Sequence, residues 1–133
     1  MDVWEPVLAK LTLLRDSWPT PPWIWDSRFS TVGASFAKAD EPQVRASAMH
    51  AFPRGWTAAS IETAPEEFRA LAGKTGGLRA GQRLLAGDPE TMPTLFGLWW
   101  PWSGGETITL RIGILDLDAT RAPLPQIRAL FSA

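Results

Sequence analysis

Apolar side chains recur at steps of three and four positions over residues 2–18, a spacing that predicts an amphipathic helix. The apolar face of this helix consists of Trp4, Val7, Leu8, Leu11, Leu14 and Trp18. Asp2 is followed three residues later by Glu5, a capping-box pattern, so we expect the helix to begin at Asp2. Three prolines, of which Pro19 is the first, then end the helix and favour an extended connection.

Strand-forming residues follow these prolines. Trp23-Ile24-Trp25 predicts a short strand, and the next three residues, 26–28, have the composition of a turn. Residues 29–36 predict a second strand, which Gly33 weakens. The two segments are therefore expected to pair in an antiparallel sheet.

Helical patterns return in the middle of the chain. Asp40 and Gln43 form a capping pattern for a helix that runs to about Ala51, and residues 63–72 form a second capped helix that ends at Gly73. The buried stripe expected for the first of these helices is Val44, Ala48, Ala51 and Phe52.

The following segment contains much glycine and proline. Residues 73–94 therefore predict mainly loop, with an edge strand at residues 83–86. Residues 125–131 again place apolar side chains at helical spacing and predict a last helix that packs back on the domain.

Two apolar runs on either side of Gly104-Gly105 predict a β-hairpin over residues 95–117. A two-residue turn at the glycines would place Trp100 opposite Thr109 and mix apolar and polar side chains on each face. A three-residue turn instead pairs Trp100 with Ile108 and gathers most of the large apolar side chains on one face. Because a slip of one residue turns a whole strand over, we predict the three-residue turn.

This register gives the hairpin a second, more polar face. That face carries Trp99, Thr107, Thr109 and Arg111, and Trp99 would lie close enough to Arg111 for a cation–π contact. It is a candidate binding surface. The alternative is that a helix covers this face and that Trp99 belongs to the core.

Tryptophan is the most unusual component of the composition, with eight in 133 residues. Each tryptophan buries ~150–250 Å², so a chain of this length is expected to leave some of them at a groove, a rim or an interface. The residues that we predict to bind a partner or ligand are Trp23, Trp25, Arg28, Trp99, Trp102 and Arg111. The alternative is a tryptophan-rich core with some exposure at its edge.

The remaining composition fits one globular domain over residues 1–133, with 45% hydrophobic and 20% charged residues. The net charge of −1 argues weakly against a dedicated nucleic-acid binder. The chain has no cysteine, no signal-peptide pattern and no apolar stretch that approaches ~18 residues, so we expect a soluble cytoplasmic protein. The expected fold class is α+β: an N-terminal amphipathic helix and an antiparallel sheet with three to four short helices.

The sequence contains no complete motif for catalysis or metal binding. Gly73-Lys74-Thr75 resembles the end of a phosphate-binding loop, but Phe68 stands where that motif requires a glycine. His50 is the only histidine, which excludes the common zinc sites in a chain without cysteine. Asp116 and Asp118 alternate at the end of the hairpin and fit a solvated strand end better than a metal site. We expect no catalytic residue, metal or cofactor.

The function predicted from these features is a non-enzymatic, cytoplasmic protein-interaction domain of the adaptor, inhibitor or immunity type, with one unidentified protein partner. One alternative is a small-molecule-binding protein or small enzyme whose tryptophan-lined pocket holds an apolar or aromatic ligand. The other is a protein that binds single-stranded nucleic acid by tryptophan and arginine stacking. No membrane contact is expected.

Overall fold

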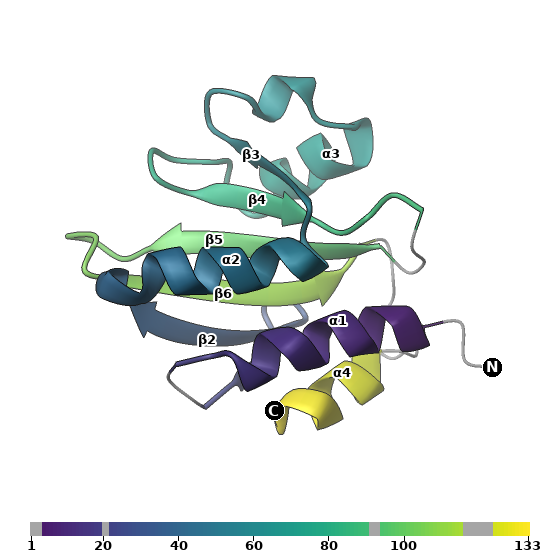
Figure 1. Cartoon of the computed structure of the whole chain (residues 1–133). Helices are drawn as coiled ribbons and strands as arrows, with labels where there is room; N and C mark the ends of the chain where they lie inside the picture. Colours follow the sequence, from purple (N-terminus) through teal and green to yellow (C-terminus); the bar gives the residue numbers. More distant parts are fainter. Residues whose placement is uncertain (1–3, 20–21, 91–93, 116–123) are drawn as a thin grey trace.

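The structure is a computed structural model that describes residues 4–19, 22–90, 94–115 and 124–133. Its described residues form four α-helices and six β-strands, which confirms the α+β fold class (Figure 1). The elements in chain order are α1 (Glu5–Asp16), β1 (Ile24–Asp26), β2 (Thr31–Ala37), α2 (Glu41–Ala51), β3 (Arg54–Thr57), α3 (Glu66–Lys74), β4 (Arg83–Ala86), β5 (Leu95–Pro101), β6 (Thr107–Ile114) and α4 (Leu124–Phe131).

The strands form one sheet in the order β1-β2-β6-β5-β4-β3, and each neighbouring pair is antiparallel. Side chains alternate between the two faces of a strand, and residues directly opposite each other on paired strands share a face. The pairing therefore assigns every strand residue to one of two faces. We call them the helix face and the open face.

Helices α1, α2 and α4 cover the helix face (Figure 1). Most side chains predicted for the apolar stripes of α1 and α2 are buried, among them Leu11, Leu14, Val44 and Ala48. Trp4 and Leu8 of the predicted stripe are half-buried. The sheet residues in the same cluster are Val32, Ala34, Phe36, Leu95, Trp99, Ile108, Leu110, Ile112 and Ile114. This main core thus joins the helices to the middle of the sheet.

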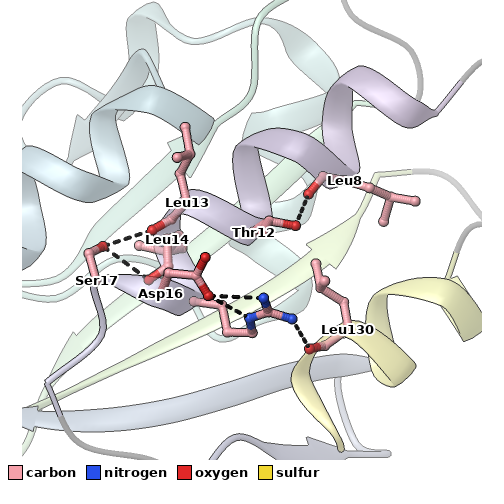
Figure 2. A network of polar contacts seen from close by, with 8 residues as sticks. Leu8, Thr12, Leu13, Leu14, Asp16, Ser17 and Leu130 are labelled. Atoms are coloured by element: carbon pink, nitrogen blue, oxygen red, sulfur yellow. Dashed lines mark hydrogen bonds and ion pairs between the residues drawn. The ribbon is translucent and has the colours of Figure 1, made fainter.

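Polar contacts at the end of α1 add to this packing (Figure 2). Arg15 Nη1 donates a hydrogen bond of 3.2 Å to the Leu130 carbonyl on α4, and the same guanidinium pairs with Asp16 at 2.9 Å. Ser17 Oγ donates to the Leu13 carbonyl at 2.9 Å. The bond to Leu130 occupies a carbonyl group in the last turn of α4, a position that the helix itself does not satisfy. The Leu13 carbonyl also accepts the backbone N–H of Ser17 at 3.2 Å.

The open face is covered by α3 over only part of its width. Phe68 and Ala72 of α3 pack on Leu84 of β4 and on Phe96 and Leu98 of β5. Strand β5 is consequently buried on both faces, and this explains its nearly continuous apolar sequence.

The hairpin is present, but the predicted register is wrong. Trp100 lies opposite Thr109, so the polar residues of β6 share a face with Trp100 and not with Trp99. Gly104 and Gly105 both have positive φ, of 94° and 74°, and lie in the connection between the strands. The error arose because we expected one apolar face, whereas β5 carries large apolar side chains on both.

Packing against glycine explains the observed register. Phe96 pairs with Gly113, and a Cβ atom on that glycine would lie 2.5 Å from Cζ of the phenylalanine ring. On the helix face, a Cβ atom on Gly97 would lie 3.2 Å from Leu110 Cδ1 and 3.4 Å from Phe52 Cζ. Both glycines therefore make room for side chains of neighbouring elements.

Two further strand expectations need correction. Strand β3 was not expected, because its four residues follow a helix directly and include Gly55. It is the edge strand on that side, so β4, expected at the edge, is an interior strand between β5 and β3.

The helix ends also differ from the expected capping boxes. Neither α2 nor α3 has a side-chain cap bond: Gln43 donates to the Ser17 carbonyl, and Thr63 donates to the Ser60 carbonyl. Helix α3 does not end at Gly73; it continues to Lys74. Helix α1 begins at Glu5, with Trp4 at the N-cap position, and not at the predicted cap Asp2, which lies outside the described residues.

Candidate functional site

A groove of about 650 Å³ lies on the part of the open face that α3 leaves uncovered. It runs over β1, β2 and β6, and none of its lining residues belongs to a described helix. The side chains that shape it include Ile24, Asp26, Ser35, Trp102, Thr109 and Arg111, with Gly33 in its floor. We call this region the β1-β2-β6 groove.

Strand pairing brings the polar floor together from distant parts of the chain. Gly33 lies opposite both Ile24 of β1 and Arg111 of β6, and Ser35 lies opposite Thr109. A Cβ atom on Gly33 would lie 3.1 Å from Arg111 Cγ. The missing side chain thus gives the arginine space to lie across β2 toward Asp26.

An ion pair spans the groove from β6 to β1. Arg111 Nε donates to Asp26 Oδ2 at 3.1 Å, and the two side chains are only 20% and 24% exposed. Arg28, in the turn after β1, adds an ion pair of 3.5 Å to the same oxygen, and its backbone N–H donates to Asp26 Oδ1 at 2.9 Å. The carboxylate therefore holds Arg111 and the turn in place together.

These contacts shift the acid–base equilibrium of Asp26. Burial by itself raises the pKa of the carboxyl group, but the hydrogen bonds from Arg111 and from the Arg28 N–H, with the charges of both arginines, lower the pKa below its ordinary value of 3.8. Asp26 is therefore ionised in the folded protein even in mildly acidic solution.

We expect Asp26→Asn to remove a pH-dependent part of the stability. Because the folded-state pKa lies below the unfolded value, the carboxylate stabilises the wild type fully above pH 3.8 and loses this effect as the pH falls through the folded-state pKa. The melting temperatures of wild type and variant, measured between about pH 7 and pH 2.5, should therefore converge toward acid. A difference that stays constant over this range would show that the charge of Asp26 does not stabilise the fold.

Hydroxyl groups form a second polar cluster in the groove. Trp102 Nε1 donates to Thr109 Oγ1 at 2.7 Å, and this oxygen lies 2.8 Å from Ser35 Oγ. The three groups carry three polar hydrogens but make two hydrogen bonds with one another. Whichever hydroxyl donates to the other, one hydroxyl hydrogen is left over for an acceptor outside the cluster.

Aromatic rings flank the guanidinium of Arg111. Its Cζ atom lies 5.1 Å from the ring centroid of Trp100 and 5.9 Å from that of Phe29. Both distances are within the range of cation–π attraction. The predicted partner of Arg111 in such a contact, Trp99, lies on the other face of the sheet.

The residues predicted to bind a partner or ligand divide into two groups. Trp102 and Arg111 line the groove with their side chains, and Arg28 is tied to it through Asp26. Trp25 also borders the groove, but it lies opposite Val32, so its side chain is on the helix face, where Arg128 Cζ lies 4.3 Å from its ring centroid. Trp102 is 57% exposed, whereas Trp23 and Trp99 are 6% and 3% exposed and belong to the main core.

The residues of the groove that are absent from the predicted site include Ile24, Asp26, Gly33 and Ser35. The sequence pattern places Ile24 in a strand, Asp26 in a turn and Gly33 at a weak point of its strand, and it assigns no role to Ser35. A usable signal was present: small residues without an apolar side chain, Gly33 and Ser35, alternate in β2 with the buried Val32, Ala34 and Phe36, which is typical of a strand face that no apolar layer covers.

Other candidate chemistry gains no support from the geometry. His50 is exposed on α2, and no group of three or more His, Cys, Asp or Glu residues in the described parts of the chain could hold a metal ion. Thr75 Oγ1 donates to carbonyl groups at the end of α3, as expected of a helix terminus and not of a phosphate loop. Asp116 and Asp118 lie outside the described residues.

Comparisons with protein-family models, curated proteins and solved structures found no match. The longest described helix, α1, has 12 residues, and no helix in the described ranges is long and apolar enough to cross a membrane.

Proposed function

We propose that this chain is a non-enzymatic protein-interaction domain that binds one partner protein through the β1-β2-β6 groove. The observation that carries the proposal is that α3 covers only part of the open face. Two large apolar side chains are exposed beside the uncovered part. Ile24 and Trp102 are 64% and 57% exposed, and both line the groove. Tryptophan is among the residues that most often dominate binding energy at an interface, so Trp102 is the expected main anchor.

The groove also has the rigidity that a recognition surface needs. Its floor consists of paired strands, and the Asp26–Arg111 ion pair and the Trp102–Thr109 hydrogen bond fix two of its side chains. Preformed surfaces of this kind lose little conformational entropy on binding. An adaptor, inhibitor or immunity-type protein would act by such binding alone. A cytoplasmic location belongs to the same proposal, because a chain without cysteine needs no oxidising compartment.

Site-specific photo-crosslinking in the native host tests this proposal. A benzophenone amino acid at position 24 or 102 should give an adduct with one defined protein. The matched control is position 13, since Leu13 on α1 is 58% exposed but does not line the groove. Adducts of equal yield at position 13, or none at either groove position, would contradict binding through the groove.

The volume of the groove favours one alternative function, the binding of a small molecule. About 650 Å³ lies within the range of ~300–1,000 Å³ that is usual for ligand pockets. In that case native mass spectrometry of protein from the host should show a small added mass that Trp102→Ala loses, and the crosslinking experiment should give no protein adduct.

A further inference from the structure

We propose that the groove recognises a carboxylate: an aspartate or glutamate side chain of the partner that accepts hydrogen bonds from the Arg111 guanidinium and from the Ser35–Thr109 hydroxyl pair. This inference rests on the proposed function and names the chemistry of the partner segment. It follows from hydrogen-bond donors that the described residues leave unused at one place.

Arg111 supplies the first of these donors. A guanidinium carries five N–H groups, and the described contacts use the Nε–H, which donates to Asp26 at 3.1 Å. No hydrogen bond of the two terminal amino groups is found with the described residues. Because the carboxylate of Asp26 takes the Nε side and Trp100 flanks the guanidinium at 5.1 Å, the side chain is held in place for a second acceptor.

The hydroxyl cluster supplies a second donor on the neighbouring strand positions. Thr109 already accepts from Trp102, and one hydrogen of the Ser35–Thr109 pair has no acceptor within the cluster. Ser35 and Thr109 lie opposite each other, two positions along their strands from Gly33 and Arg111. Residues two apart on a strand lie on the same face with their Cα atoms about 7 Å apart, so a partner segment laid over the groove faces both donors.

The charges in and beside the groove favour a single negative charge on the partner. Arg28 and Arg111 stand against Asp26, which leaves one positive charge, although the whole chain has a net charge of −1. One carboxylate balances this charge, whereas a phosphate group would bring nearly two negative charges close to Asp26. The surplus therefore favours an acidic side chain over a phosphorylated one.

The rims of the groove indicate which side chains flank the acidic residue in the partner segment. Ile24 lies on β1 and Trp102 lies in the connection between β5 and β6, and both expose apolar surface beside the polar floor. A partner segment that places an acidic side chain on Arg111 can bury apolar side chains against both. We therefore expect a segment in which aspartate or glutamate stands between apolar residues.

Selection from a phage-displayed library of random 12-residue peptides on the immobilised full chain tests this inference. The enriched peptides should contain an acidic residue with apolar residues on both sides. In a synthetic copy, replacement of that acid by its amide should weaken binding roughly 10- to 100-fold, the usual range for a hydrogen bond to a charged group.

A double-mutant cycle links the effect to the groove. The variant Arg111→Gln should bind the acidic peptide more weakly than wild type does, by a similar factor. It should bind the amide peptide no worse than wild type does. Ser35→Ala is a second variant, which leaves the ion pair intact. It should weaken the binding of the acidic peptide more than that of the amide peptide. Arg45→Gln is the matched control, because Arg45 is exposed on α2, which covers the opposite face of the sheet.

The other outcomes separate this inference from the proposed function. Enriched peptides whose binding needs Trp102 but which carry no acidic residue would overturn the carboxylate inference and would still support the groove as the binding site. Acidic peptides that bind Trp102→Ala and Arg111→Gln as well as wild type would overturn the carboxylate inference, because they would bind outside the groove. A selection without enrichment would overturn the carboxylate inference alone, since crosslinking at positions 24 and 102 decides the proposed function independently.

Discussion

Replacement of Trp99 by alanine is expected to lower the free energy of unfolding by about 3–5 kcal/mol, the range usual for removal of a buried aromatic side chain. Trp99 is 3% exposed, and its ring centroid lies 5.2 Å from that of Phe36, which in turn contacts Trp18 at 5.3 Å. The alanine would leave a cavity between β5 and helix α2, beside Phe52 and Leu85. Since domains of this kind are stable by about 5–15 kcal/mol, such a loss is a large share of the total.

Urea denaturation of wild type, Trp99→Ala and Trp102→Ala measures this difference. Trp102 is 57% exposed, so its removal should cost less than about 1 kcal/mol, mainly through loss of the bond to Thr109. Equal and small losses for the two variants would contradict the burial of Trp99. A large loss for Trp102→Ala would instead show that its ring supports the fold, which would weaken its role as a binding anchor.

The sequence allowed the helices and most strands to be predicted, because their signals are local. The spacing of Val7, Leu11 and Leu14 marks α1, and the buried stripe of α2 follows from Val44 and Ala48 in the same way. The helix ends differ from the predicted ones. Capping patterns depend on side-chain rotamers that tertiary contacts can change, as Gln43 shows by its bond to the Ser17 carbonyl.

The hairpin register could not be predicted, because it depends on which faces of the sheet are covered. Either register was compatible with the turn at Gly104-Gly105. The choice of one apolar face was reasonable for a sheet with one solvated side, but α3 buries Phe96 and Leu98 on the side opposite Trp99. The position of α3 over the sheet is a feature of the tertiary structure, which the pattern of the hairpin alone does not show.

The candidate site was predictable only in part for a related reason. Arg111 and Trp102 could be singled out as unusual residues in a hairpin, and both line the groove. Asp26 gains its importance from the pairing of β1 with β2 and of β2 with β6, which brings it to Arg111 across 85 positions of sequence. No local pattern encodes such a neighbour.

Trp102→Ala should also produce the largest loss of binding. An exposed tryptophan at the rim of a preformed groove is the kind of residue whose truncation typically costs at least 2 kcal/mol of binding free energy, or roughly 30-fold in affinity. The matched control is Leu13→Ala, which removes an equally exposed apolar side chain, of 58% against 57%, from helix α1.

The most direct test of the account is therefore the affinity of wild type, Trp102→Ala and Leu13→Ala for the partner captured by crosslinking, measured by isothermal titration calorimetry. We expect a loss of about 30-fold or more for Trp102→Ala, an unchanged affinity for Leu13→Ala, and native-like stability for both. Equal affinities of wild type and Trp102→Ala would contradict the claim that the β1-β2-β6 groove is the binding site.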